Sequence, residues 1–358
     1  MSTIDEKLES VVTNLRNNLT TDRLDMSYGE IISMYETDEI IISPQFQRLF
    51  RWNTEKRTRF IESIILGIPI PPIFVAEDND GKWELVDGLQ RISSILSFFG
   101  VLKNSNTNNR WTLEAGSLIG ELEGYDIDTL PEKYIRNIKR TYCRVEIIKW
   151  DSNYDMRYEL FNRLNTGGAA LTDQEIRNCI FRGTSEKFND LLKELTLTEG
   201  FRELINIGEI KVQELYDEEL ILRFFALFYT DLSEIKAKNI SFFMTDFMEN
   251  TIKNNSFNYE EGKEIFSRTI NILKLLDSNI FRFRNNQFST SLYDSIMIGI
   301  AQNIEKYEKM DLELIKGKID TLKNCEDFKK YIGAAASSKS RLVNRMRVSC
   351  EFFAEDKK

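Results

Sequence analysis

The sequence predicts an α+β protein, with a small mixed α/β domain over residues 1–152 followed by an all-helical domain over residues 153–358. Two patterns lead to this prediction. Stretches that read as β-strands lie between about residue 39 and residue 150, mixed with short helices, and beyond residue 183 apolar residues recur at helical spacing. A chain of 358 residues is long enough for two domains, each with its own core.

The N-terminal part predicts helices on either side of a short strand. Residues 1–20 are polar and residues 26–35 are amphipathic, and we expect each stretch to form a helix. Residues 39–42 are rich in isoleucine and read as a strand. A further helix is expected between Asn53, a typical N-cap residue, and Gly67, a typical C-terminal stop. Its apolar stripe consists of Phe60, Ile61, Ile64 and Ile65.

A β-hairpin and a strand-to-helix corner follow. Residues 72–75 and 83–86 are apolar and flank Asn79-Asp80-Gly81, which is a strong turn signal. The second strand breaks at Asp87-Gly88, after which apolar residues recur at helical spacing over residues 92–99. The pattern therefore predicts a glycine between a strand and the first turn of a helix.

Such a corner can hold an anion. Glycine lets the backbone approach a ligand closely, and the new helix offers unpaired N–H groups and the positive end of its dipole. Asp87 could then handle a metal ion or a proton, and Arg91 could bind phosphate. The alternative is purely local: Asp-Gly is a common turn, and Arg91 can pair with Asp87 across one helical turn.

Further elements and polar stretches follow this corner. Residues 130–140 predict a helix and residues 143–150 the clearest strand of the chain. The aromatic stripes of the helical domain, such as Phe242, Phe243 and Phe247, are expected to be core. The basic residues near the C-terminus can contact a nucleic-acid or nucleotide phosphate or form a solvated helix face. They are Lys339, Arg341, Arg345 and Arg347.

Two more stretches combine polar residues with local structure. Residues 46–52 hold aromatic residues and arginines after a strand, which suggests a loop that is part core and part binding surface; alternatively Phe46 and Trp52 are core, with Arg48 stacked on one of them. In residues 158–181, a Gly-Gly turn is followed by a helix that Thr172 and Glu175 begin as a capping box. The polar residues that this turn could bring to one face are Arg163, Asn165 and Glu175.

Composition excludes several kinds of chemistry. The chain has no histidine, which removes the usual general base, the usual zinc ligand and the His-dependent nuclease centre. A net charge of −9 argues against nonspecific coating of nucleic acid. The four cysteines form no Cys-x-x-Cys pair, no apolar run reaches the length of a bilayer span, and the polar start lacks a signal-peptide layout. We therefore expect a reduced, cytoplasmic protein without a membrane segment.

Three separated stretches together resemble one known family. Residues 46–52 (FQRLFRW), 62–71 (ESIILGIPIP) and 87–91 (DGLQR), continued by residues 163–175, resemble the N-terminal domain family of GmrSD-type restriction endonucleases, which belongs to the ParB/sulfiredoxin-like superfamily. The resemblance covers residues 25–185 closely. It implies a small α/β core that binds a nucleoside triphosphate and Mg²⁺ in prokaryotic defence against phage and foreign DNA.

The resemblance also assigns residues. It implies Asp87, Gln90 and Arg91 as the catalytic residues, with Asp87 as the metal ligand. The implied nucleotide-binding residues are Gln47, Arg48, Gly88 and Arg91, with Arg163, Asn165 and Glu175 as second-motif contacts. Relatives often show a second glutamine where this chain has Leu89, so nucleotide binding is better supported than hydrolysis. Restriction members carry a His-dependent nuclease domain, and we expect a partner protein to perform any cleavage.

Three functions follow from these observations. The first is a nucleotide-binding module, with or without Mg²⁺-dependent hydrolysis of the triphosphate, that regulates a DNA-acting partner. The second is a non-catalytic adaptor or antitoxin-like regulator that binds a partner protein or DNA, and the net negative charge suits a protein partner better. The third is a carboxylate- and metal-dependent DNA nuclease that uses the hairpin carboxylates. These are Asp78, Asp80, Glu84 and Asp87, although turn residues are usually solvated.

Overall fold

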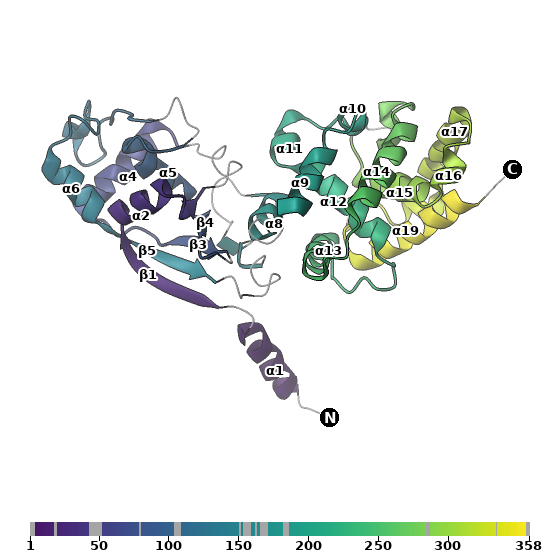
Figure 1. Cartoon of the computed structure of the whole chain (residues 1–358), viewed down its shortest axis with the longest axis horizontal. Coiled ribbons are helices and arrows are strands. Elements are labelled where there is room, and N and C mark those ends of the chain that lie inside the picture. The colour runs from purple at the N-terminus through teal and green to yellow at the C-terminus, as the bar shows by residue number, and fades with distance from the viewer. Residues whose placement is uncertain are drawn as a thin grey trace. The chain divides into compact units, whose positions relative to one another are not determined.

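The chain folds into two compact units, Met1–Ala170 and Leu171–Lys358 (Figure 1). The computed structural model describes residues 4–17, 20–42, 52–78, 80–103, 109–149, 152, 159–161, 163–164, 171–181, 186–283, 287–333 and 335–355. It is 60% helical and 10% strand, with one small mixed sheet, which confirms the predicted α+β class. In the described part of the chain, no helix has both the length and the apolar character that a membrane crossing requires.

The first unit is built on a five-stranded sheet in the order β1-β5-β3-β4-β2. Its strands are β1 (Thr21–Ser27), β2 (Ile40–Ile41), β3 (Ile73–Glu77), β4 (Trp83–Asp87) and β5 (Tyr142–Ile148). β1 pairs antiparallel with β5 and β4 antiparallel with β3, whereas β3 runs parallel to β5 and β2 parallel to β4. The strands predicted around residues 39–42, 72–75, 83–86 and 143–150 are therefore confirmed.

The edge strand β1 was not predicted. Its sequence, TDRLDMS, is exposed over most of its length, and Met26 is its buried residue. It is held by the backbone ladder to β5, from Thr21 opposite Ile148 to Ser27 opposite Tyr142. An edge strand with one solvated face and charged side chains has no apolar run or alternation to reveal it.

The β3–β4 hairpin has the turn that its sequence predicts. The Oδ1 of Asp78 accepts the backbone N–H groups of Asp80 at 2.9 Å and Lys82 at 2.8 Å, so this carboxylate stabilises the turn. Gly81 supplies the positive φ of +81° that an L side chain rarely adopts. A register shift between Phe74 and Val75 lies at the start of β3, where Phe74 pairs with Asp87 at the end of β4.

Helices α2 (Tyr28–Glu36), α4 (Thr54–Leu66), α5 (Leu89–Phe98) and α6 (Glu132–Arg140) lie together on one side of the sheet, and α2 packs against β1 and β2 (Figure 1). A 3-10 turn, η1 (Gly120–Leu122), precedes α6, whereas α1 (Ile4–Asn17) extends away from the sheet and is exposed. As predicted, the Asn53 side chain accepts the N–H of Lys56 to begin α4, and Gly67 ends it with a φ of +71°. The shared core includes Tyr28, Ile31, Ile61, Ile64, Val75, Leu85, Ile92, Ile95, Leu96, Val145 and Ile147.

The second unit is helical, as predicted. Its helices are α8 (Asp173–Phe181), α9 (Glu186–Leu195), α10 (Phe201–Ile205), α11 (Glu209–Gln213), α12 (Tyr216–Tyr229), α13 (Ile240–Asn254), α14 (Tyr259–Leu273), η2 (Ser278–Phe281), α15 (Thr290–Ala301), α16 (Ile304–Tyr307), α17 (Leu312–Asn324), α18 (Glu326–Lys329) and α19 (Lys339–Ala354). α15 is buried from Ser291 to Ala301 and lies at the centre of the unit. A Cβ on Gly299 would overlap the Phe353 ring, so this glycine lets α19 pack closely on α15.

A buried charge cluster joins three of these helices. Asp294 of α15 accepts hydrogen bonds from Arg223 of α12 at 2.8 Å and from Arg345 of α19 at 3.0 Å, and all three side chains are nearly inaccessible. The sequence allowed Arg345 a phosphate contact or a place on a solvated face, and both interpretations are wrong because the side chain is buried. Since two guanidinium groups share one carboxylate here, removal of the carboxylate would leave uncompensated buried charge.

We predict that Asp294→Ala lowers the free energy of unfolding by about 3–5 kcal/mol, because it leaves two buried guanidinium groups without their carboxylate. Urea denaturation followed by circular dichroism measures this loss. The matched control is Asp320→Ala, which removes a carboxylate that is 59% exposed and pairs with Lys323 at 3.7 Å. This exposed pair is worth about 0–1 kcal/mol. Equal losses in the two variants would contradict the role of the buried cluster.

Candidate functional site

The predicted corner between strand and helix is present at Gly88. β4 ends at Asp87, Gly88 adopts a φ of +95°, and α5 begins at Leu89. A Cβ on Gly88 would lie 2.5 Å from Cγ2 of Ile73, at the start of β3. Two independent reasons therefore require glycine at this position: the left-handed backbone conformation and the close approach of β3.

Arg91 binds the end of β4 and the segment that leads into β3. Its Nη2 lies 3.1 Å from Oδ2 of Asp87, one helical turn earlier. Its Nη1 donates to the backbone carbonyls of Pro71 and of Pro72, the latter at 3.2 Å. The guanidinium side chain is 14% exposed and the Asp87 carboxylate 43% exposed. The local pairing that the sequence allowed is thus realised, and Arg91 also fixes the entry of β3 against the start of α5.

Gln90 connects the corner to the segment before α4. Its Oε1 accepts the backbone N–H of Trp52 at 3.1 Å. Trp52 is half-buried and packs edge-on against Phe60 of α4, with ring centroids 5.9 Å apart, so Trp52 is part of the core. Gln47 and Arg48, which the resemblance assigns to the same site, lie outside the described residues.

The first turn of α5 lacks a capping side chain. Gly88 provides no side-chain cap, and the first turn contains no acidic residue. The first N–H groups of any α-helix lack intrahelical partners, and the helix dipole places partial positive charge there. A helix that begins at a glycine without a side-chain cap is the arrangement found at phosphate-binding helix ends.

Beneath the corner lie two buried groups that the sequence interpretation missed. The hydroxyl of Tyr28 is buried next to the thiol of Cys143 of β5. Burial raises the pKa of the Tyr28 phenol and the pKa of the Cys143 thiol, although the charge of Arg91 opposes both shifts. Both groups therefore stay neutral near pH 7. The sequence signal for Cys143 was its place in the alternating pattern of β5, which puts its side chain on the inward face.

Glu62 of α4, in the second resembling stretch, supports a neighbouring loop. Its carboxylate is 2% exposed and accepts the backbone N–H groups of Leu118 and Ile119, each at 2.7 Å, and the Ser117 hydroxyl at 2.9 Å. Burial by itself would raise the pKa of Glu62, but these hydrogen bonds together hold it below its usual range. The carboxylate is thus ionised, and its structural role is to hold residues 117–119.

The described second-motif residues belong to different units. Arg163 is 75% exposed and pairs with Glu159 at 2.9 Å within the first unit. Glu175 is buried in the second unit and forms the predicted capping box: Thr172 N–H donates to its Oε2 at 2.8 Å, and its own N–H donates to the Thr172 hydroxyl at 3.3 Å. Asn165 lies outside the described residues. The structure therefore gives Glu175 a capping role of its own.

Carboxylates in the described structure do not gather into a metal site of the usual protein-only kind. Within the described ranges, no group of three or more His, Cys, Asp or Glu residues could hold a metal ion. Mg²⁺ in nucleotide sites commonly uses one or two carboxylates together with substrate phosphates. Asp87 is a partly exposed carboxylate next to the start of α5.

Comparison with known proteins identifies the first part of the chain. Residues 28–182 match the family model described as the N-terminal domain of GmrSD restriction endonuclease. These residues form a GmrSD N-terminal domain. The match confirms the family that the sequence resembles, and it indicates a DNA-acting protein of the restriction or defence type. It runs from the start of α2 past the end of α8 and so includes the whole Gly88 corner. Searches of curated proteins and of solved structures gave no match.

We predict that Gly88→Ala destabilises the GmrSD N-terminal domain more than Gly81→Ala. Both residues have positive φ, but a Cβ on Gly81 would meet nothing within 4 Å, whereas one on Gly88 would meet Ile73. The left-handed conformation costs an alanine about 1–2 kcal/mol, and overpacking adds about 1–3 kcal/mol at Gly88. Urea denaturation of the two variants measures the free energy that the contact with Ile73 costs. Equal destabilisation would show that the Ile73 side chain moves aside at no cost in free energy.

We predict that Glu62→Gln removes a pH-dependent part of the stability. Because the folded-state pKa of Glu62 is depressed, its contribution is fully present above about pH 5 and is lost as the pH falls through the folded-state pKa. At pH 7 the free energy of unfolding of the variant should be about 1–3 kcal/mol lower than that of wild type. This difference should shrink toward pH 3. The control is Glu121→Gln, at an exposed carboxylate. A pH-independent difference would contradict the role of the carboxylate.

Proposed function

We propose that the GmrSD N-terminal domain of this protein binds a nucleoside triphosphate with Mg²⁺ at the Gly88 corner. The nucleotide then regulates a DNA-acting partner in defence against foreign DNA. The observation that carries this proposal is the start of α5, which has no side-chain cap and lies beside Arg91 and Asp87. Helix N-terminal N–H groups together with an arginine are a recurrent means of binding phosphate.

Each residue of the signature has a role in this proposal. The N–H groups that follow Gly88 donate to phosphate oxygens, and Arg91 supplies the positive charge next to them. Asp87 ligates Mg²⁺ or orients a water molecule. Asp87 and Arg91 are paired 3.1 Å apart, which keeps both charged groups at the corner. In a magnesium nucleotide, Mg²⁺ would be the new partner of Asp87 and phosphate the new partner of Arg91. Gln90 accepts the N–H of Trp52, a residue that follows Gln47 and Arg48 closely in the sequence.

Hydrolysis is a secondary part of the proposal. Phosphoryl transfer requires mainly positioning and charge stabilisation, so a chain without histidine can support it. Leu89 replaces a glutamine that is frequent in relatives, and an apolar side chain at that position cannot orient a water molecule. We therefore propose nucleotide binding as the primary activity, with cleavage of DNA left to a partner protein.

A non-catalytic adaptor is the second candidate function, because one observation favours it. Nη1 of Arg91 already donates to the carbonyls of Pro71 and Pro72, and Nη2 to Asp87, so the signature can serve the fold alone. In that case the domain would bind a partner protein with its structure unchanged by nucleotides. The net charge of −9 suits a protein partner better than DNA.

We predict that Arg91→Ala weakens binding of the preferred nucleotide at least tenfold, which corresponds to about 1.4 kcal/mol. Isothermal titration of the four ribonucleoside triphosphates with Mg²⁺ measures the affinities, and circular dichroism checks that each variant is folded. The matched control is Arg59→Ala, at an exposed arginine of α4 outside the corner. Asp87→Asn should remove the Mg²⁺ dependence of binding.

Two outcomes would count against this proposal. Equal affinities of wild type and Arg91→Ala would separate the nucleotide site from the Gly88 corner. No binding of any of the four nucleotides by a folded wild-type protein would favour the adaptor function, and a stable complex on co-expression with a neighbouring gene product would then support it.

A further inference from the structure

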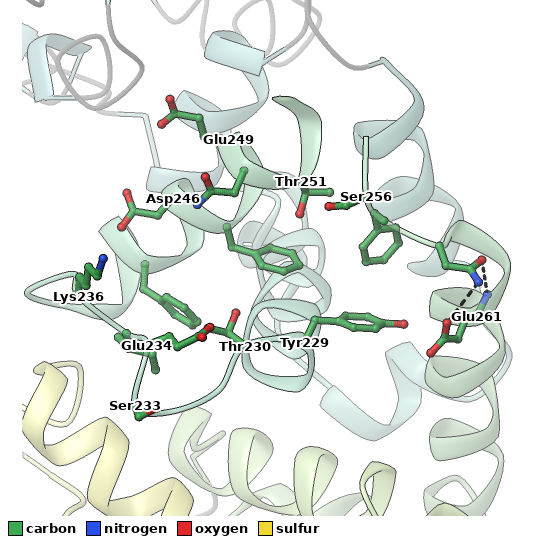
Figure 2. A pocket seen from close by; sticks show the side chains of 16 residues that line it. Tyr229, Thr230, Ser233, Glu234, Lys236, Asp246, Glu249, Thr251, Ser256 and Glu261 are labelled. Carbon is green, nitrogen blue, oxygen red and sulfur yellow. Dashed lines mark hydrogen bonds between the residues drawn. The ribbon is translucent and has the colours of Figure 1, made fainter. Parts of the chain in front are cut away.

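The helical unit contains a cavity that neither the signature nor the family match accounts for. It lies between the end of α12, the loop that leads to α13, α13 itself and the start of α14, and it has a volume of about 930 Å³ (Figure 2). All of its lining residues belong to the second unit, beyond the matched segment 28–182. We call it the α12–α14 pocket.

Aromatic rings form the floor of this pocket. The Tyr229 and Phe257 rings lie with their centroids 5.3 Å apart and their planes at 72°, so the two rings meet as a corner. Phe243 and Phe247 of α13 also line the pocket. The sequence predicts the α13 aromatic residues as core, and Phe243 is indeed buried, but Phe247 remains partly exposed. Tyr229 is likewise 36% exposed, so part of the aromatic surface is accessible.

The aromatic floor is stable and neutral. Phe257 packs edge-on against Phe188 and Phe225 as well as Tyr229, which fixes its orientation. Burial, together with the nearby Glu261 carboxylate, raises the pKa of Tyr229 to about 12. The phenol therefore stays protonated at neutral pH and presents a neutral ring.

Four of the lining residues carry carboxylates. Figure 2 shows Glu234 on one side of Tyr229 and Glu261 on the other, while Asp246 and Glu249 extend from α13. The lining contains one ammonium group beside these four carboxylates, that of Lys236. Glu249 also pairs with Lys253 outside the pocket, and Glu261 accepts from the Asn258 amide at 3.2 Å. Carboxylates outnumber ammonium groups even when Lys253 is counted, so the formal charge of the pocket lining is net negative.

We propose that the α12–α14 pocket binds a lysine or arginine side chain of a basic segment in a partner protein. Aromatic faces attract cations through their quadrupole, and the lining carboxylates add attraction and disfavour phosphates. A cavity of about 930 Å³ exceeds the needs of one ammonium group and can hold a side chain with its flanking peptide. The net charge of −9 on the chain would also favour the approach of a basic partner. This proposal does not depend on nucleotide binding.

Fluorescence anisotropy with the full-length protein tests the proposal. The probe is a fluorescein-labelled octapeptide of alternating arginine and glycine, and an octapeptide of alternating glutamate and glycine is its charge control. We expect only the arginine peptide to bind. Tyr229→Leu should weaken that binding roughly 5- to 30-fold, because it removes the ring face, whereas Tyr229→Phe retains the face and should bind like wild type.

The acidic contribution has its own matched pair. Glu234→Gln changes an exposed pocket residue and should weaken binding about two- to fivefold, whereas Glu209→Gln changes an exposed carboxylate of α11 that does not line the pocket and should have no effect. Since Glu234 is exposed, this variant should remain folded even where Tyr229→Leu does not. Thermal unfolding of every variant verifies this.

Three results would overturn the proposal. The first is absence of binding of the arginine peptide to wild-type protein. The second is equal binding by wild type, Tyr229→Leu and Glu234→Gln, since the peptide would then bind elsewhere. The third is binding of spermidine as tight as that of the peptide at equal cation charge, because the ligand would then be a free polyamine and not a protein segment.

Discussion

The contact between Gly88 and Ile73 is the constraint on which the candidate site depends. Because a Cβ at Gly88 would lie 2.5 Å from the Ile73 side chain, the start of β3 approaches the corner as closely as a glycine allows. Arg91 holds this approach through the Pro71 and Pro72 carbonyls and through Asp87. The signature thus has a structural function in the sheet, and the same geometry leaves the first turn of α5 uncapped beside a charged pair.

The two units use their charges differently. At the Gly88 corner the Asp87–Arg91 pair is partly exposed, and such a pair can exchange its partners for a ligand at modest cost. In the helical unit, Arg223, Asp294 and Arg345 are buried, where an exchange of partners would leave a charge uncompensated. The first arrangement suits binding and the second suits fixed packing of α12, α15 and α19. The α12–α14 pocket is a third case, in which carboxylates line a pocket together with accessible aromatic rings.

Much of the local structure follows from short-range chemistry. The Asn53 cap and the Gly67 stop of α4, the turn at Gly81 and the capping box of Glu175 were all predictable, since each depends on residues within a few positions of one another. The Gly88 corner was predictable for the same reason. The edge strand β1 was not, because its stability comes from the ladder to β5, more than a hundred residues away in the chain.

The amino-acid sequence by itself determined the α+β class, the absence of histidine chemistry, the GmrSD family of residues 28–182 and the position of the glycine corner. Only the tertiary structure decided how the charged side chains are used. Arg345 lies in a basic stretch but is buried against Asp294, Tyr28 and Cys143 lie beneath the corner, and Tyr229 and Phe257 meet in one pocket. Burial and pairing of a side chain depend on partners that are distant in sequence, and no local pattern records them.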